Sequence, residues 1–129
     1  MQAARRRREA RIERAEGHLA FARQEAEVGY KDSDERRIRD SAEKTWLAVC
    51  EAVDHAMESH GKAPPVGPHA HSERREFLER FDLSLAKDMA YFAEKLHGDC
   101  FYSARCPTKM GMMNAMEEAE QFLRRVKNL

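Results

Sequence analysis

Apolar residues recur along most of this chain at alternating spacings of three and four, which is the period of an amphipathic α-helix. The first such repeat reaches about residue 28 and consists of Ile12, Ala15, Leu19, Ala22 and Ala26. It predicts a long helix whose alanine-rich stripe lets neighbouring helices approach closely. Gly29 follows the stripe, and we expect it to end this helix as a left-handed C-terminal cap.

A second repeat predicts a helix that reaches about residue 60, just before Gly61. Its stripe consists of Ile38, Ala42, Trp46, Val49, Val53 and Ala56, with Met57 alongside. Asp32, Ser33 and Asp34 are candidate N-caps, and Asp32 with Glu35 has the spacing of a capping box. Because the connection to the first helix is only a few residues long, we expect the two helices to be antiparallel neighbours.

A third helix is expected after residues 61–71, whose three prolines and two glycines cannot continue the second one. We expect it to start at Ser72 with Glu73 and to stop at Gly98. Its stripe consists of Leu78, Phe81, Leu85, Met89, Phe92 and Leu96. Asp82 and Ser84 are suited to cap a restart, which predicts a kink near residue 83.

A fourth repeat predicts a helix from about Lys109 to about Lys127. Its stripe consists of Met112, Met116, Ala119, Leu123 and Val126. Four compatible stripes joined by short or medium loops predict an all-α fold, a four-helix up-down-up-down antiparallel bundle. No strand pattern persists and no linker interrupts the chain, so we expect residues 1–129 to form a single domain.

The first ten residues carry an arginine run, Arg5 to Arg8, at the start of the first helix. Cations at a helix N-terminus oppose the helix dipole. We therefore expect residues 1–10 to be a basic arm that frays as a solvated tail. A phosphate-binding arm is the alternative interpretation of the same residues.

The overall composition suits a small bundle with a charged outer face. Charged residues make up 36% of the chain and apolar residues 42%, and the formal net charge is zero. A neutral protein has no global field that steers it onto nucleic acid, so any contact with a polyanion has to be local. Zero net charge also leaves self-association easy.

Cysteine usage and the length of the apolar runs bear on the compartment. Cys50, Cys100 and Cys106 are an odd number, and their spacing is neither that of a zinc ribbon nor that of a redox pair. The first residues lack the apolar stretch of a signal peptide, and no apolar run approaches the roughly 18 residues of a membrane span. We expect reduced thiols, a cytoplasmic location and no membrane association.

We find no catalytic or metal-binding signature in the chain. Glu94 and His97 form one Glu-x-x-His pair, whereas a di-iron bundle needs two such pairs and two further glutamates. No metal and no cofactor are therefore expected, and Cys50 is interpreted as a small buried hydrophobe. Four methionines near the start of the fourth helix cannot all face one core, and an exposed patch among them would indicate a dimer surface. They are Met110, Met112, Met113 and Met116.

Three stretches of the sequence carry a family likeness. They are RIERAEGHLAFARQEAE, SAEKTWLAVCEAVDHAMESHG, and LHGDCFYSARC followed by MMNAMEEAEQFLRRV. Together they resemble the HEPN-like superfamily of prokaryotic helical bundles, and within it the PaREP-type archaeal repetitive-element family. The most specific shared features are Leu96-His97-Gly98 with Phe101-Tyr102, and the alanine and Trp46 spacing of the second helix.

The resemblance implies a four-helix bundle that often forms homodimers. Some HEPN relatives bind nucleotides or pair with a nucleotidyltransferase in toxin–antitoxin systems. Others are metal-independent ribonucleases that carry an arginine, four to six residues and then a histidine. Here Arg14 precedes His18 with only three residues between, and no arginine stands at that distance before His55, His60, His69, His71 or His97. This departure argues against ribonuclease activity.

We therefore expect a non-catalytic HEPN-like module that forms a homodimer and binds a nucleotide, an RNA or a protein. The candidate ligand-binding residues are Trp46, His55, His97, Tyr102 and Arg105. In this interpretation Arg105 holds a phosphate, while His97 and Tyr102 donate hydrogen bonds. The alternative is that His97 and Tyr102 only join the loop to the bundle.

Two other functions stay open at this point. One is a ribonuclease toxin of the same superfamily with a degenerate motif. It would use His18 or His97 as general base, and Arg14 or Arg105 to stabilise the phosphorane charge. The other is a small structural subunit whose methionine patch docks onto a larger enzyme.

Overall fold

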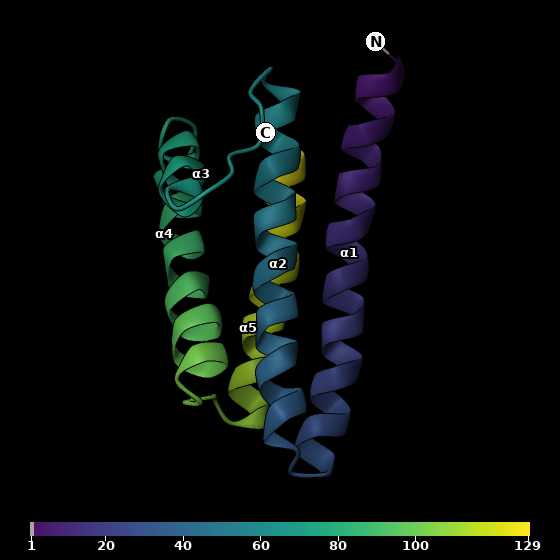
Figure 1. Cartoon of the computed structure of the whole chain (residues 1–129), viewed down its shortest axis with the longest axis vertical. Coiled ribbons are helices and arrows are strands. Elements are labelled where there is room, and N and C mark those ends of the chain that lie inside the picture. Colours follow the sequence, from purple (N-terminus) through teal and green to yellow (C-terminus); the bar gives the residue numbers. More distant parts are fainter. Residues whose placement is uncertain (1) are drawn as a thin grey trace.

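The computed structural model describes residues 2–129, with only the backbone described at Ala4 and Arg8, and this part of the chain is helical without strands (Figure 1). Five α-helices and one π-helix follow one another as α1 (Gln2–Lys31), α2 (Glu35–Ser59), α3 (Ala70–Glu79), α4 (Leu83–Phe92), η1 (Ala93–Tyr102) and α5 (Lys109–Lys127). The all-α prediction is therefore confirmed for the described residues. The basic arm is helical from Gln2 onward, its described side chains up to Glu9 are exposed, and its fraying stays a prediction.

Helix α2 is the centre of the molecule. It contacts every other described helix, whereas α1 contacts only α2 and α5. In Figure 1, α1 lies on one side of α2, α3 and α4 lie on the other side, and α5 runs behind it. One long side of α1 is thus left without a helix against it.

The turn between α1 and α2 has its cap at Asp34, one of the three candidates. The Asp34 carboxylate accepts a hydrogen bond from the backbone N–H of Arg37 at 3.2 Å. The prediction that Gly29 ends the first helix is wrong, because α1 continues to Lys31 and Ser33 takes the left-handed conformation (φ 51°). Gly29 instead permits close approach: a Cβ there would lie 3.0 Å from Cγ1 of Ile38.

The third predicted helix is two helices. α3 ends at Glu79, and α4 begins at Leu83 after Asp82 accepts a hydrogen bond from the backbone N–H of Ser84 at 2.9 Å. The predicted interruption near residue 83 is confirmed, and it is a full break. Because Phe81 lies in this break, its side chain is 47% exposed and does not continue the buried stripe.

The helix that starts at α4 does not stop at Gly98, so that prediction is wrong as well. Its last part is the π-helix η1, in which hydrogen bonds reach five residues back, as from the N–H of Ser103 to the carbonyl of Gly98 at 3.1 Å. A π-helix turns more slowly than an α-helix, so residues four and five apart share a face. This brings His97, Phe101 and Tyr102 to one side of η1.

The predicted apolar stripes form the core. The stripe residues of α1 and α5 are all buried, and so are those of α2 from Ala42 onward, with Ile38 partly buried against them. Among the clustered methionines, Met112 and Met116 are buried, and Met110 is 76% exposed. The methionines therefore mainly fill the core, and the exposed patch that would mark a dimer surface is reduced to one side chain.

The cysteines differ from the expectation of three reduced thiols. Cys100 and Cys106 form a disulfide across the connection between η1 and α5. Cys50 is free and buried, as predicted, and its burial raises the pKa of the thiol to about 12. None of the described helices combines the length and the apolar character that a membrane span requires.

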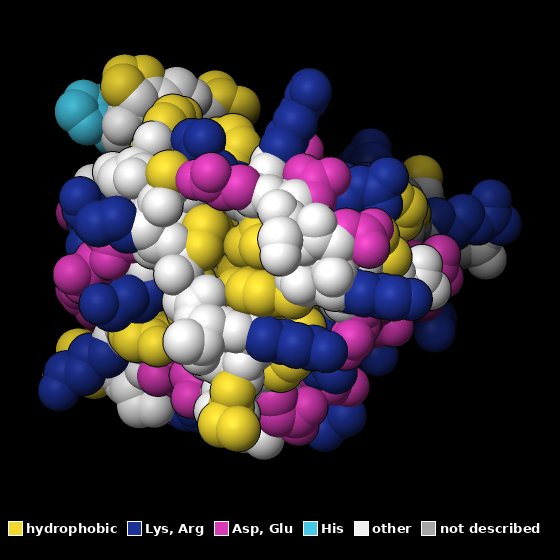
Figure 2. Space-filling view, turned by 90° about the horizontal axis from the view of Figure 1, so that it is seen from below, with side chains coloured by type: hydrophobic (Ala, Val, Ile, Leu, Met, Phe, Trp, Pro, Cys, Tyr) yellow, Lys and Arg dark blue, Asp and Glu magenta, His cyan; other side chains and the backbone are white. Residues whose placement is uncertain are grey.

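One end of the molecule is formed by the α1–α2 turn and the connection from η1 to α5. Seen from this end, apolar side chains lie among Lys, Arg, Asp and Glu side chains, and neither sign of charge covers the face (Figure 2). Tyr102 and Met110, which flank the connection, are both largely exposed. This mixed face agrees with the zero net charge of the chain.

A histidine pair as the candidate functional site

Two histidines from different elements meet beside the single tryptophan. His71 comes from the first turn of α3, His97 from η1 and Trp46 from α2. The ring of Trp46 lies 5.1 Å from that of His71 and 5.6 Å from that of His97, measured between ring centroids. The centroids of the two imidazoles are 5.8 Å apart. Tyr102 closes the group, with its ring 4.8 Å from that of His97. We call these four residues the histidine cluster.

The His97 ring is oriented by Glu43. Nδ1 of His97 lies 2.9 Å from one oxygen of the Glu43 carboxylate and 3.0 Å from the other. Burial raises the pKa of Glu43, and the contact with His97 acts in the opposite direction. Because an ionised carboxylate only accepts, Nδ1 of His97 carries the proton. Its Nε2 is then an acceptor when the ring is neutral.

The His71 ring is oriented by Arg74. A guanidinium N–H of Arg74 lies 3.0 Å from Nδ1 of His71. Arginine has no acceptor, so Nδ1 of His71 must accept and its proton sits on Nε2. Burial lowers the pKa of His71, and the positive charges of Arg74, His97 and Arg75 lower it further. His71 is therefore a neutral hydrogen-bond donor at neutral pH.

Arg74 is itself held by a carboxylate from α2. It donates to both oxygens of Asp54, at 2.8 and 3.1 Å, and both side chains are nearly buried. Burial alone would lower the pKa of Arg74, but the hydrogen bond and charge of Asp54 outweigh this and the pKa is raised. The pair fixes the start of α3 against α2 and thereby positions His71.

The segment that carries Tyr102 is fixed from three sides. Arg39 of α2 donates two hydrogen bonds to the carbonyl of Phe101, at 2.6 and 3.0 Å. The hydroxyl of Tyr30 donates to the carbonyl of Pro107 at 2.6 Å. The disulfide between Cys100 and Cys106 closes the loop that connects η1 to α5. The Tyr102 ring nevertheless stays 66% exposed, which makes its face accessible.

The arrangement offers one donor and one acceptor side by side. Within residues 2–129, no hydrogen bond is formed by Nε2 of His71 or by Nε2 of His97. The first can donate to an anion and the second can accept a proton. The tautomer of His71 opposes metal ligation, since its Nε2 carries the proton. The described residues also contain no group of three or more side chains that could hold a metal ion.

The structure brings together three of the five residues expected at the ligand site, Trp46, His97 and Tyr102. Trp46 is only 2% exposed, so its ring packs against the two imidazoles from the core side and not from the solvent side. Arg105 is 74% exposed and lies 3.5 Å from Asp99, without a contact to the cluster. His55 lies nine residues after Trp46, which places it on the opposite side of α2.

Sequence reasoning missed three members of the site, namely Glu43, His71 and Arg74. His71 was assigned to the proline-rich loop, and only the earlier start of α3 at Ala70 puts His71 and Arg74 on one helical face. Their spacing of three was the signal that could have found them. Glu43 carries a similar signal, because it lies three residues before Trp46 on the same helix.

A second arginine, Arg11, stands upstream of His18. Arg11 precedes His18 with six residues between, which does satisfy the spacing of four to six. In the structure the Arg11 guanidinium is engaged elsewhere, with Nε 3.0 Å from Glu58 and Nη1 3.4 Å from Glu51. The pairs join α1 to α2, so the Arg11–His18 spacing marks no assembled site.

No protein-family model matches this chain, and neither does any curated protein or any solved structure. The comparisons therefore neither support nor contradict the HEPN-like resemblance, which rests on the sequence motifs alone.

Proposed function

We propose that this chain is a non-catalytic, HEPN-like helical module that forms a homodimer and binds a phosphate-bearing partner, a nucleotide or an RNA, at the histidine cluster. The observation that carries this proposal is the 3.0 Å contact between Arg74 and Nδ1 of His71, from which the tautomer of His71 follows. Its Nε2–H points away from Arg74 and stays a donor at neutral pH, which suits an anionic oxygen.

The charges around the histidine cluster are of both signs. The charges of Arg74, His97 and Arg75 lower the pKa of His71, whereas the Asp54 carboxylate, which pairs with Arg74, acts in the opposite direction. The exposed ring of Tyr102 adds a surface on which a base can stack. Tyr102 and His71 would then hold the two ends of a nucleotide.

The HEPN-like assignment is part of this proposal. It takes α1, α2, α4 with η1, and α5 as the four helices of an up-down-up-down bundle, with α3 as an addition. Support comes from Trp46, His97 and Tyr102, which carry the resemblance in the sequence and lie together in space. A cytoplasmic location belongs to the same proposal, and the Cys100–Cys106 disulfide is the feature that speaks against it.

A second candidate is a metal-independent ribonuclease, and the contact between Glu43 and His97 favours it. A carboxylate that orients an imidazole is the arrangement of a general base. Nε2 of His97 would take the proton of a ribose 2′-hydroxyl as its oxygen attacks the phosphorus, and Nε2–H of His71 would give its proton to the 5′-oxygen that leaves. Arg14 and Arg105, named from the sequence, have no contact with this pair among the described residues.

One experiment separates the two candidates. A labelled 20-nucleotide oligo(A) RNA is incubated with the protein in chelator, and both its fluorescence anisotropy and its integrity on a denaturing gel are followed. We expect intact RNA and binding that falls about tenfold in His71→Gln, as for loss of a hydrogen bond to a charged group. His69→Gln, an exposed histidine two residues away, is the matched control and should bind normally.

Either failure has a clear meaning. RNA fragments that disappear in His97→Gln would establish the ribonuclease and overturn the non-catalytic proposal. Equal binding by the wild type, His71→Gln and His97→Gln would remove the histidine cluster from the binding site.

A further inference from the structure

The disulfide of this chain closes a loop that contains a residue of the histidine cluster. Cys100 lies near the end of η1, Cys106 lies in the connection to α5, and the bond between them encloses residues 101–105. Tyr102 is one of the enclosed residues. The position of its exposed ring against His97 therefore depends on a loop that a thiol reagent can open.

Tyr102 reaches His97 because the end of η1 is π-helical. Tyr102 follows His97 by five residues, and at 3.6 residues per turn an α-helix would set the two side chains about 140° apart. In η1 they share one side, and their rings are 4.8 Å apart. Because π-helical turns are rare, a local constraint has to select this register over an α-helix.

The backbone that follows η1 is strained. Ala104 has φ 57°, a left-handed conformation that residues other than glycine rarely adopt. The N–H groups of Ala104 and Arg105 bond to the carbonyls of Cys100 and Asp99, at 3.1 and 2.7 Å. The side chains of residues 103–105 are exposed, so they contribute little packing that would hold this turn. The disulfide is the constraint that spans it.

Other contacts fix the two ends of the loop. Arg39 donates to the carbonyl of Phe101 at 2.6 Å and, over a longer distance of 3.4 Å, to that of Tyr102. At the other end, Tyr30 donates to the carbonyl of Pro107 at 2.6 Å. These contacts do not involve the cysteines. Breaking the disulfide therefore leaves both ends in place and frees the turn between them.

We propose that the Cys100–Cys106 disulfide is a redox switch of the histidine cluster. The oxidised chain keeps the Tyr102 ring against His97 and binds its ligand, whereas the reduced chain releases Tyr102. This inference rests on the proposed function, in which a base stacks on Tyr102. It also reconciles the disulfide with a cytoplasmic location, because disulfides of cytosolic proteins are mostly transient and often redox-sensing.

The switch exchanges two electrons with a dithiol. Cys106 is partly exposed and Cys100 is fully buried, so an external thiolate attacks Sγ of Cys106. The S–S bond breaks, and Cys100 leaves as a thiolate that takes up a proton. The second thiol of the reductant then loses its proton and closes the reductant's own disulfide. This step releases Cys106, which takes up a proton as well, and an oxidised dithiol reverses both steps.

The third cysteine does not interfere with this exchange. Cys50 is buried in α2, and its burial raises the pKa of the thiol to about 12. It therefore provides no thiolate at neutral pH that could attack the disulfide. Since the chain has only three cysteines, Cys100 and Cys106 are the one pair that exchanges.

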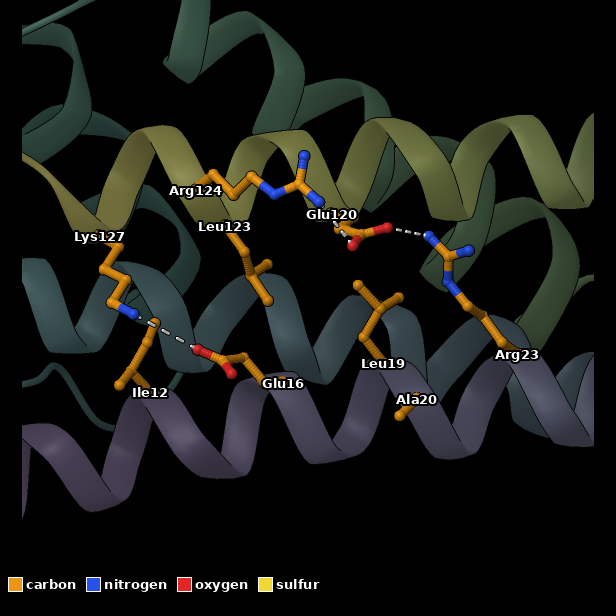
Figure 3. A pocket seen from close by; sticks show the side chains of 9 residues that line it. All are labelled: Ile12, Glu16, Leu19, Ala20, Arg23, Glu120, Leu123, Arg124 and Lys127. Atoms are coloured by element: carbon orange, nitrogen blue, oxygen red, sulfur yellow. Dashed lines mark hydrogen bonds and ion pairs between the residues drawn. The ribbon is translucent and has the colours of Figure 1, made fainter.

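The far part of the bundle provides an internal control for folding. Leu19 of α1 and Leu123 of α5 are buried, and ion pairs join the two helices on either side of them (Figure 3). Among the described helices α1 has no contact with η1, and Leu123 lies roughly 20 Å along α5 from its start. The methyl resonances of the two leucines should therefore be the same in the oxidised and the reduced protein.

Reduction by dithiothreitol tests the switch. The oxidised and the reduced protein are titrated with the same labelled oligo(A) RNA, and the imidazole C–H resonances of His97 are followed by NMR. We expect reduction to shift the His97 resonances, because the Tyr102 ring leaves, and to weaken RNA binding about tenfold, as for the loss of one base–aromatic stack. Cys106→Ala should behave like the reduced wild type with and without dithiothreitol. Cys50→Ala is the matched control and should keep the full response.

The outcomes separate the switch from the proposed function. Unchanged His97 resonances after reduction would overturn the switch, and so would shifted Leu19 and Leu123 methyl resonances, since the disulfide would then be needed for the fold. RNA binding that is equal in both states but lost in His71→Gln would uphold the proposed function and overturn the switch. Shifted His97 resonances without RNA binding in either state would uphold the movement of Tyr102 and overturn the proposed function.

Discussion

Arg74 forms a two-point ion pair with Asp54 that joins the start of α3 to the C-terminal part of α2. The same guanidinium donates to His71, so a single side chain links the packing of α3 to the tautomer of the imidazole. The stability of this part of the fold and the chemistry of the histidine cluster are therefore coupled.

Arg74→Ala should lower the free energy of unfolding by about 1–3 kcal/mol, because it removes both hydrogen bonds to the buried carboxylate of Asp54 and leaves it only Arg11, at 3.9 Å. Urea denaturation followed by circular dichroism measures this loss. Arg75→Ala, an exposed arginine on the next position, should change stability by no more than about 0.5 kcal/mol. Equal effects at the two positions would show that the Asp54 pair is not a structural anchor.

His71 should make the protein less stable as the pH falls. Its pKa is lower in the folded chain than the ordinary value near 6.5, so the unfolded chain binds the proton more readily between the two values. The free energy of unfolding therefore drops as the pH falls through that window. His71→Gln should flatten the drop, and subtracting its profile from the wild-type profile removes the contribution of Glu43.

The cysteines give a test by counting thiols. The chain has three cysteines, of which only Cys50 is a free thiol, and it is buried with a pKa of about 12. The folded protein should therefore react with no alkylating reagent at pH 8, and the unfolded, unreduced protein at one site. Mass spectrometry after labelling distinguishes this from three reactive thiols, which would mean that Cys100 and Cys106 are not joined.

Two glycines of α1 should respond to alanine in opposite ways. At Gly17 an added Cβ meets nothing within 4 Å, so Gly17→Ala should stabilise the helix by about 0.5–1 kcal/mol. At Gly29 it would lie 3.0 Å from Ile38, so Gly29→Ala should destabilise by about 1–3 kcal/mol. Thermal denaturation of both variants checks the contrast, and equal shifts would mean that α1 and α2 do not approach closely at Gly29.

The helices were predictable because each buries one face, and a buried face leaves a period in the sequence. Leu19, Val49 and Leu123 could be assigned to the core on that ground alone. The helix ends were less predictable. Glycine commonly ends a helix, but neither glycine does so here. Gly29 lies within α1 and permits the close approach of Ile38, and Gly98 lies within the π-helix η1.

Three of the four residues of the histidine cluster were named from the sequence, namely Trp46, His97 and Tyr102. Trp46 and His97 stand on long amphipathic segments, so a helix could be predicted for each of them. His71 could not be placed with them, since its position depends on the path of the proline-rich loop and on the ion pair of Arg74. The disulfide depends likewise on the fold of a connection that has no period.

The single tryptophan touches both imidazoles. An excited indole ring loses its energy to a protonated imidazole in contact with it, so the fluorescence of Trp46 follows the charge of its two neighbours. Any molecule that changes the protonation of His71 or His97, or inserts between them, alters this emission. The protein thus contains its own optical probe of the histidine cluster, and a library of unlabelled ligands can be screened against it without a reporter dye.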